Sequence, residues 1–322
     1  MTIPPRVHFC WIGRNLPWAY VFAVLSAAER SALPEITLHH TDMLDDGAEL
    51  RALTNAVGVT LHRIDPIACL TETGRELGIG DQLTELYRGL DSPTMRADIL
   101  RAAILFQQGG IYLDLDTVTV SSLSPLLDAT QFVGCEYIVW PRHVRASRSP
   151  ARWARSLTLD LLRKVMRRKN HGWKAFGRIE RFYYRGINNA VMGAEPNSPL
   201  FARYLRAMPT VTPERLRQAY ALGPHLLQEL VDNDRQDDLI IHGPQIFYPL
   251  PPEISEHWFR IGNDIRLDAV LSAETRIVHW YASVRTKSRV ALITPTYVRE
   301  HRKDQLYSAL VYSCISNLPE AV

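Results

Sequence analysis

The sequence has few cysteines, no long apolar run and, in one stretch, almost no acidic residues. Its four cysteines are scattered and form no CxxC pair, which is typical of reduced, mostly buried thiols in a cytoplasmic protein. The longest apolar stretch, around residues 18–28, is too short to span a bilayer. Pro4, Pro5 and Arg6 interrupt the N-terminus, so we expect no signal peptide.

The stretch with few acidic residues is 142–185. It contains 11 Arg and 3 Lys, but its only acidic residues are Asp160 and Glu180. Within it, residues 151–169 are predicted to form a basic amphipathic helix. The helix has an apolar face of Trp153, Leu157, Leu161 and Val165, while Arg155, Arg163, Arg167 and Arg168 lie elsewhere. Three interpretations remain open: the apolar face packs on the core, it lies on an anionic membrane, or the helix grips an anionic acceptor. No nucleic-acid motif accompanies the charge, so we predict no nucleic-acid partner.

The remaining composition is that of a globular protein. Of the 322 residues, 46% are hydrophobic and 22% are charged, and the net charge is only +3. This is enough to bury a large core. No clear linker divides the chain, so we expect a single domain over residues 1–322.

A helix is predicted after Ser92 and Pro93, because serine is a favourable N-cap and proline costs nothing at the first helical position. The buried stripe of this helix recurs at three- and four-residue spacing and consists of Met95, Ile99, Ala102, Ala103 and Phe106. Gly109 and Gly110 end the helix, since glycine readily adopts a left-handed cap.

The segment after these glycines, residues 111–115, is predicted to be an apolar strand that ends in two carboxylates. Side chains alternate along a strand, so Asp114 and Asp116 share one face. Two carboxylates on one face repel each other unless a cation lies between them, and a hard divalent cation prefers such oxygen ligands. The spacing alone is not specific: Asp232 and Asp234 repeat it in a charged stretch that we predict to be solvated surface.

Strands and helices alternate along the chain. Strands are predicted at 6–12, 36–40, 59–64, 132–139 and 276–281, with a small apolar element at 187–194; helices are predicted at 18–31 and 48–57, and after Ser198, Thr212 and Gly223. This alternation predicts an α/β fold with a doubly wound, mostly parallel sheet. Ligands of such sheets bind outside the carboxyl ends of the strands, which places Trp11, Gly13 and the two aspartates on one rim. The turn-rich segment 239–252 allows no prediction.

Four segments resemble the DXD region and its flanking motifs in glycosyltransferase family 32. They are the run from helix through Gly-Gly to DxD, the first strand over 3–13, the asparagine-containing segment 187–194, and the His-Trp-x-x-Ser segment 279–283. That group includes capsule and polysaccharide transferases and the fungal initiating α-1,6-mannosyltransferases, and it is similar to the catalytic domains of the large clostridial glucosylating toxins. The resemblance covers residues 1–285 and does not specify the sugar.

The resemblance implies a GT-A-type fold, a divalent cation (Mn²⁺ or Mg²⁺), and transfer with retention at the anomeric carbon. It places a nucleotide-sugar-binding half in residues 1–130, an acceptor-side half in 131–290 and a C-terminal tail in 291–322. UDP is favoured over GDP as the donor base on family frequency. The expected location is the cytoplasm, at the inner face of the membrane if the basic helix binds lipid.

The resemblance also implies roles for individual residues. It gives catalytic or sugar-contacting roles to Asp98, Arg101 and Asn189, with Asn188 as the alternative in register; donor contacts to Trp11, Gly13, Asp114 and Ser283; and a metal site to Asp114, Asp116 and His279. The family commonly has a second tryptophan after the serine, and Val284 stands there in this chain. Arg285 or Lys287 would then supply charge to the diphosphate in its place.

These features predict a metal-dependent retaining glycosyltransferase that moves a hexose-type sugar from a nucleoside-diphosphate sugar to a saccharide, lipid-linked or small-molecule acceptor. A toxin-like enzyme that glycosylates a protein is an alternative with the same chemistry. A metal-dependent phosphodiesterase is an alternative of another class, although such an enzyme would need a larger cluster of Asp, Glu and His ligands to hold two metal ions. A non-catalytic nucleotide-sugar-binding protein is disfavoured by the intact pair Asp114 and Asp116.

Overall fold

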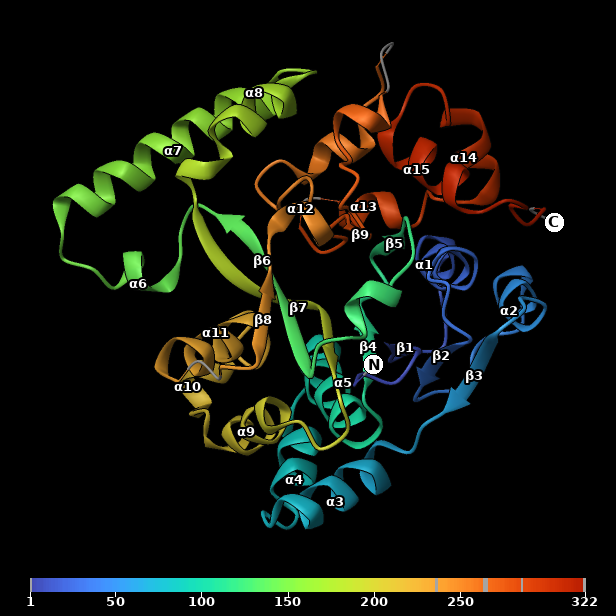
Figure 1. Ribbon diagram of the computed structural model, residues 1–322, viewed down its shortest axis with the longest axis vertical. Coiled ribbons are helices and arrows are strands. Elements are labelled where there is room, and N and C mark those ends of the chain that lie inside the picture. The colour runs from blue at the N-terminus through green and yellow to red at the C-terminus, as the bar shows by residue number, and fades with distance from the viewer. Residues whose placement is uncertain (1, 235–236, 263–265, 285, 321–322) are drawn as a thin grey trace.

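The computed structural model describes residues 2–234, 237–262, 266–284 and 286–320, and a twisted sheet forms its centre (Figure 1). Within the described residues, the main sheet has the strand order β3-β2-β1-β4-β7-β6-β8, and β5 pairs with β9 in a separate ribbon. The strands are β1 (Arg6–Trp11), β2 (Glu35–His40), β3 (Val59–Arg63), β4 (Gly110–Leu113), β5 (Thr117–Thr119), β6 (Gln131–Ile138), β7 (Tyr184–Ala194), β8 (Leu239–His242) and β9 (Ile277–His279). Neighbours in the main sheet are parallel, except that β7 is antiparallel to β4 and β6. The predicted α/β class with a mostly parallel sheet is confirmed.

Helices cover both faces of the sheet. The α-helices are α1 (Trp18–Arg30), α2 (Ala48–Thr54), α3 (Pro66–Leu77), α4 (Gln82–Gly89), α5 (Pro93–Gln108), α6 (Arg142–Arg145), α7 (Pro150–Arg168), α8 (Gly172–Ile179), α9 (Pro199–Ala207), α10 (Pro213–Leu216), α11 (Pro224–Asn233), α12 (Pro244–Phe247), α13 (Lys287–Val290), α14 (Pro295–His301) and α15 (Leu306–Cys314). Short 3-10 turns are η1 (Ser124–Leu126), η2 (Glu180–Phe182), η3 (Met208–Thr210), η4 (Ser255–Phe259) and η5 (Leu267–Ala269). Helices α1 and α15 pack on one side with β5, whereas α5 packs on the other side against β1, β4 and β7, with α9 packed on α5.

Helix α5 begins and ends where the sequence predicts. The Ser92 hydroxyl accepts the Met95 N–H at 3.4 Å, and Pro93 occupies the first turn. Residues 98–106 are all buried, because α5 packs between the sheet and α9. Gly109 ends the helix at φ +62°, where an added Cβ would lie 2.6 Å from Pro196 Cδ. Both the backbone angle and the space therefore require glycine there.

Some predicted boundaries were wrong. The strand predicted over 111–115 ends at Leu113, so Asp114 and Asp116 lie in the turn that follows it. The Thr117 hydroxyl closes this turn by donating to the Asp114 carbonyl at 2.7 Å. The helix predicted over 48–57 ends at Thr54, since the chain must turn there to begin β3 at Val59. The segment 239–252 contains β8 and α12.

Helix α7 lies outside the sheet and turns a polar stripe inward. Among its buried residues, Asp160 and Arg163 pair with each other, and Arg163 also lies 2.8 Å from Glu253. Burying such charges is tolerated because each one has a partner. Leu159 and Met166 are buried in the core beside these charges. The other large apolar residues of the helix are between 39% and 64% exposed, and they are Trp153, Leu157, Leu161, Leu162 and Val165. The helix thus packs one stripe on the core, but the predicted apolar face is not that stripe.

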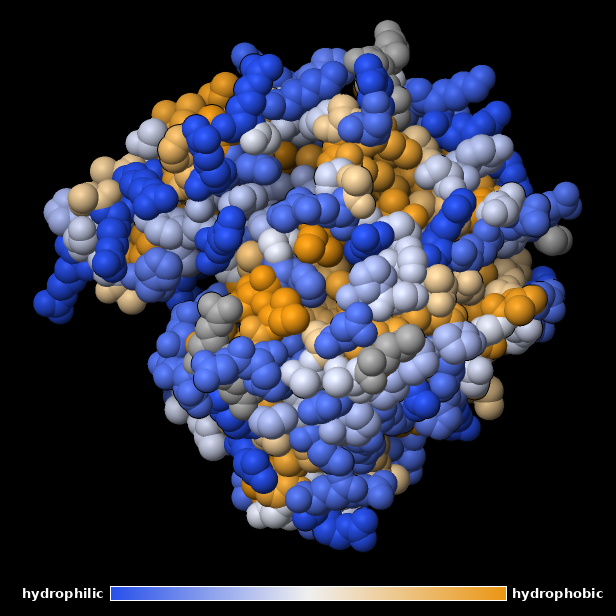
Figure 2. Space-filling view, viewed as in Figure 1, coloured by the Kyte–Doolittle hydropathy of each residue, from blue (hydrophilic) through white to orange (hydrophobic). Residues whose placement is uncertain are grey.

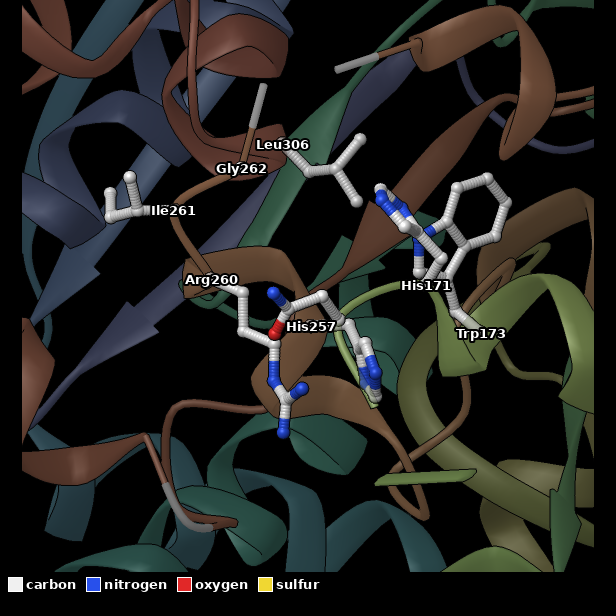
Figure 3. Close-up of a pocket in the computed structure, with 8 residues that line it drawn as sticks. His171, Trp173, His257, Arg260, Ile261, Gly262 and Leu306 are labelled. Atoms are coloured by element: carbon white, nitrogen blue, oxygen red, sulfur yellow. The ribbon is translucent and has the colours of Figure 1, made fainter. Parts of the chain in front are cut away.

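The C-terminal end of α7 is fixed by cationic and imidazole side chains from η4 and the residue that follows it. Arg260 Nη1 donates to the Lys169 carbonyl at 2.9 Å, and His257 Nε2 lies 3.0 Å from the same oxygen. Figure 3 shows these two side chains next to each other in a small pocket that Trp173 and Leu306 also line. Donors of this kind satisfy carbonyl groups that a helix end leaves free. The pocket residues therefore belong to the contacts that hold the C-terminal end of α7 in place.

No helix in the described part of the chain is long and apolar enough to cross a membrane.

Candidate active site

Helix α5 and strand β7 bring three predicted site residues together. Asn189 donates from Nδ2 to Asp98 Oδ1 at 2.8 Å, and Arg101 Nη2 lies 3.5 Å from the same carboxylate oxygen. Arg101 also donates from Nη1 to the Asn189 carbonyl at 3.0 Å. Asn188 points to the other side of the strand, where its Oδ1 accepts the Ala190 N–H at 2.7 Å. The geometry therefore favours Asn189 over Asn188 as the partner of Asp98.

Burial controls the charge of this group. Burial raises the pKa of Asp98 to about 6, although the Arg101 charge and the Asn189 hydrogen bond act in the opposite direction. Arg101 is buried too, and burial alone would lower its pKa, but the neighbouring Asp114 raises it overall. The guanidinium thus stays charged while Asp98 titrates close to neutral pH.

Arg101 connects this group to the two aspartates. Its Nη1 lies 2.9 Å from Asp114 Oδ1, and its guanidinium lies 4.9 Å from the centre of the Tyr112 ring. Tyr112 donates its hydroxyl to Asp114 Oδ1 at 3.1 Å. One arginine therefore fixes the orientation of carboxylates from both α5 and the turn after β4.

Asp114, Asp116 and His279 form a compact group at the same edge of the sheet. One potential ligand atom from each lies within 4.8 Å of the other two. His279 Nε2 lies 2.9 Å from Asp116 Oδ1, and the Ala282 N–H donates to Asp116 Oδ2 at 2.7 Å. The β5–β9 ribbon makes this contact, because it pairs Thr117 directly with His279.

The two aspartates titrate differently. Burial raises the pKa of Asp114, and repulsion from Asp116 adds to this in spite of Arg101. Burial also acts to raise the pKa of Asp116, but the His279 charge, its hydrogen bond and the Ala282 N–H together lower it. Asp116 is thus the carboxylate that is held ionised.

This donor set fits a divalent cation. Two carboxylates and one imidazole within this distance suit a hard ion such as Mn²⁺ or Mg²⁺. His279 Nδ1 is buried and has no hydrogen-bond partner, which is unusual for a polar atom away from water. The geometry of these residues therefore agrees with the predicted metal site.

Two residues at the site were missed by the sequence reasoning. Tyr281 has a left-handed backbone, with φ at 61°, and its ring centre lies 4.0 Å from that of His279. Its hydroxyl donates to Glu136 Oε2 at 2.6 Å, and burial raises the pKa of that carboxyl. The signal for Glu136 was a lone acid inside the apolar strand predicted over 132–139. Tyr281 carried no signal of its own.

The predicted donor contacts Trp11 and Gly13 lie along the same edge. Trp11 is half-buried at the end of β1, and its ring centre lies 5.2 Å from that of Tyr20. Tyr20 in turn lies 6.3 Å from Trp280, which directly follows His279. Gly13, at φ +130°, donates its N–H to Asp42 Oδ2 at 3.0 Å.

The predicted diphosphate contacts come from the turn after β9. Ser283 is exposed and follows Ala282, whose N–H bonds Asp116. Val284 packs partly against the core, where the family commonly has tryptophan. Lys287 is exposed at the start of α13, and Arg285 lies outside the described residues.

The comparison with protein families agrees with this geometry. Residues 59–133 match the model of a glycosyltransferase sugar-binding region containing a DXD motif. The matched stretch therefore resembles the sugar-binding region of DXD-containing glycosyltransferases. The DxD triplet within it is Asp114-Leu115-Asp116. The predicted DXD-containing glycosyltransferase is thereby confirmed, while its assignment to family 32 stays a prediction.

Solved glycosyltransferase structures to which the chain is similar have low sequence identity. PaToxG glycosyltransferase is 15% identical, with 72% of this chain and 69% of that chain covered and a TM-score of 0.42. Mouse xyloside xylosyltransferase 1 is 12% identical, with 85% and 96% covered and a TM-score of 0.48. The galactosyltransferase LgtC, in complex with donor and acceptor sugar analogues, is 14% identical, with 92% and 99% covered and a TM-score of 0.39. Among curated proteins, none matches this glycosyltransferase.

Proposed function

We propose that the chain is a metal-dependent, retaining hexosyltransferase that uses a nucleoside-diphosphate sugar, with UDP favoured over GDP. The observation that carries the proposal is the group Asp114, Asp116 and His279, which lies inside and beside the matched DXD region. In this proposal residues 1–130 form the donor-binding half of one domain, and residues 131–290 form its acceptor side.

The cation that Asp114, Asp116 and His279 would hold, Mn²⁺ or Mg²⁺, supplies Lewis-acid stabilisation of charge on the leaving diphosphate. In this proposal Asp98 and Asn189 hydrogen-bond the sugar hydroxyls, and Arg101, which contacts both residues, keeps them in position. Trp11 offers a flat ring on which the base stacks.

The chemistry that we propose is substitution on one face of the sugar. The bond from the anomeric carbon to the diphosphate oxygen breaks as the bond to the acceptor oxygen forms on the same face, and the acceptor's hydroxyl proton passes to the departing diphosphate. A covalent enzyme intermediate would need a free carboxylate as nucleophile. Asp98 is engaged by Asn189 and Arg101, and Glu136 by Tyr281, so neither is free to attack.

The test is a panel of UDP- and GDP-sugars incubated with the protein, with and without Mn²⁺, with release of nucleoside diphosphate as the readout. We expect release from one donor only when the cation is present. Asp116→Asn should reduce it at least about 100-fold, since several kcal/mol of charge stabilisation are lost. Asp234→Asn is the matched control, because Asp234 has the same DxD spacing in an exposed stretch.

Two alternatives are tested beside this panel, by adding a phosphodiester substrate and a protein acceptor. Cleavage of a phosphodiester substrate without sugar transfer would establish the phosphodiesterase and overturn our proposal. Among the described residues, one three-residue group of potential metal ligands is present, which disfavours a two-metal hydrolase. Transfer to a protein acceptor would support the toxin-like version of the same chemistry.

We further propose that α7 attaches this enzyme to an anionic membrane surface, at the inner face of the membrane in the cytoplasm. Its outward face carries the exposed apolar residues of the helix, and Arg152, Arg155, Lys164 and Arg168 are exposed around them. Figure 2 shows apolar and strongly hydrophilic groups mixed over α7 and α8. A basic amphipathic helix with its apolar face free binds anionic lipid in this way.

Flotation with phosphatidylcholine vesicles, with and without phosphatidylglycerol, tests this attachment. We expect binding only to the anionic vesicles, with loss at high salt and in the double variant Leu157→Asp, Leu161→Asp. Leu292→Asp is the control, since Leu292 is 54% exposed in another part of the surface. Equal binding of the double variant and the wild type would contradict the proposal.

A further inference from the structure

A cluster of cationic side chains lies on α6, α10 and α11, outside the residues used so far. Arg142 Nη1 lies 2.5 Å from Glu229 Oε1, and Arg215 Nη2 lies 2.8 Å from Glu229 Oε2. Two guanidinium groups thus share one carboxylate, which leaves a surplus positive charge. Each of the two arginine side chains is between 30% and 39% exposed, so a ligand from solvent can reach them.

His225 belongs to the same cluster. It lies one helical turn before Glu229 on α11, so both side chains share a helix face. Burial lowers the pKa of His225, and the charges of Arg142 and Arg145 lower it further. The imidazole therefore stays neutral and keeps one N–H to donate.

Two buried nitrogens in this cluster have no hydrogen-bond partner. They are His225 Nδ1 and Arg215 Nε. Polar atoms that are buried without a partner are uncommon, because the lost hydrogen bonds to water are not replaced. An ion pair that only joined α6 to α11 would use the outer nitrogens of the arginines and would leave these two atoms unexplained.

The cluster borders the residues proposed to hold the donor sugar. The turn that leads into α11 passes directly over them: a Cβ added to Gly223 would lie 3.0 Å from both Asp98 carboxylate oxygens and from Asn189 Nδ2. Tyr220, at the other end of this turn, has a left-handed backbone with φ at 63° and is 44% exposed. A non-glycine residue in that conformation often marks a functional site. Its ring centre lies 6.0 Å from that of His225.

We propose that Arg142, Arg215 and His225 bind an anionic group of the acceptor, a phosphate or carboxylate, and thereby present its hydroxyl to the donor sugar. This inference rests on the proposed function and names the class of its acceptor. Arginine suits the task, because its planar guanidinium matches phosphate and carboxylate geometry. The excess of basic residues over 142–185 would also attract an anionic acceptor to this side of the site.

The anion could belong to a free sugar phosphate or to a lipid headgroup. Calorimetric titration of the full chain with glucose 6-phosphate and with glucose addresses the first source. We expect glucose 6-phosphate to bind at least about tenfold more tightly than glucose, since glucose lacks the phosphate that would make charge-assisted hydrogen bonds with the arginines. Arg215→Gln should remove most of this preference. Arg217→Gln should keep it, because Arg217 is a neighbouring, exposed arginine that pairs only weakly with Glu214 at 3.7 Å.

Vesicles of phosphatidylcholine with phosphatidic acid address the second source. If the anion is a headgroup, Arg215→Gln weakens flotation with these vesicles, whereas Arg217→Gln does not, and glucose 6-phosphate competes with the vesicles. If the anion is a free phosphate, Arg215→Gln weakens only the binding of glucose 6-phosphate. Both outcomes support an anion site at this cluster and separate its two sources.

The inference is overturned if glucose binds as tightly as glucose 6-phosphate and Arg215→Gln leaves vesicle binding intact. Equal losses in Arg215→Gln and Arg217→Gln would also overturn it, because they would reveal only general surface charge. Arg142→Gln serves as a second variant should Arg215→Gln unfold, which thermal melting reports. Cation-dependent release of nucleoside diphosphate by the wild type tests the proposed function separately, so a failure of either one is recognised without the other.

Discussion

Helices α5 and α7 begin in the same way, but they differ in which residues they bury. Each follows a serine and starts with proline, and each has apolar residues at helical spacing. Helix α5 buries its apolar residues together with Asp98 and Arg101. Helix α7 buries Leu159 and Met166 together with Asp160 and Arg163, but it leaves the larger part of its apolar residues exposed. Apolar periodicity therefore predicts that a helix forms, but the partners of its charged residues decide which face turns inward.

The largest expected effects come from the buried arginine of each helix. Arg101→Met leaves the Asp98 and Asp114 carboxylates buried without the guanidinium group that pairs with them. We therefore expect a loss of about 3–5 kcal/mol in the free energy of unfolding. Donor hydrolysis should fall as well. Arg163→Met leaves Glu253 without its arginine and Asp160 with Lys164 alone, so it should also destabilise the fold, but it should leave donor hydrolysis of the folded fraction intact.

Urea unfolding and diphosphate release measure the two quantities in parallel. Equal losses of activity per folded molecule in both variants would show that Arg101 has only a structural role.

The next comparison removes one leucine from each helix. Leu100 in α5 is fully buried, so Leu100→Ala should cost about 2–5 kcal/mol of stability through lost burial and a cavity. Leu161 in α7 is 64% exposed, and Leu161→Ala should change stability by less than about 0.5 kcal/mol. Chemical denaturation gives both values. A large cost at Leu161 would mean that the outward face of α7 is covered in solution.

The buried aspartates should respond to pH with opposite signs. Burial raises the pKa of Asp98 to about 6, so its folded form binds a proton more tightly than its unfolded form. Its contribution to stability is full below about pH 4 and is lost, by about 2–3 kcal/mol, as the pH rises through 6. Burial also acts to raise the pKa of Asp160, but Lys164 and Arg163 lower it overall, so its contribution is present at neutral pH and is lost in acid.

Unfolding curves of Asp98→Asn and Asp160→Asn between acid and neutral pH test these signs. Relative to the wild type, Asp98→Asn should gain stability as the pH rises, and Asp160→Asn should lose it. Slopes of the same sign in both variants would contradict the assignment.

The smallest expected difference concerns the two N-terminal serines. Ser92 accepts the Met95 N–H, whereas Ser149 makes no side-chain cap hydrogen bond. We expect Ser92→Ala to cost about 0.5–1 kcal/mol and Ser149→Ala to have almost no effect on the melting temperature. A matching cost at Ser149 would show that α7 is capped in solution as α5 is.

Local patterns predicted much of this molecule. The start and end of α5 follow from Ser92, Pro93 and Gly109, and the alternation of strands and helices from β1 to β3 follows from hydrophobic periodicity. Helices α3, α4, α14 and α15 and strand β5 were not predicted. The β4 boundary was predicted two residues too late, because Asp114 and Leu115 continue the pattern of the strand although the chain already turns there.

Contacts between distant residues could not be predicted from local patterns. Arg163 pairs with Glu253 and Tyr281 with Glu136, and no spacing rule joins residues so far apart in the chain. His279 entered the candidate site through the family resemblance alone, and the β5–β9 ribbon supplies the physical reason for its place there.

That ribbon also sets the order in which the site can form during synthesis. Its strands span only Thr117–Thr119 and Ile277–His279, yet they bring Asp116 to its imidazole partner across 163 positions of sequence. A nascent chain that has passed the DXD motif still lacks the third member of the group until residue 279 has emerged from the ribosome. The enzyme thus brings Asp114, Asp116 and His279 together late, after most of its sheet has already been made.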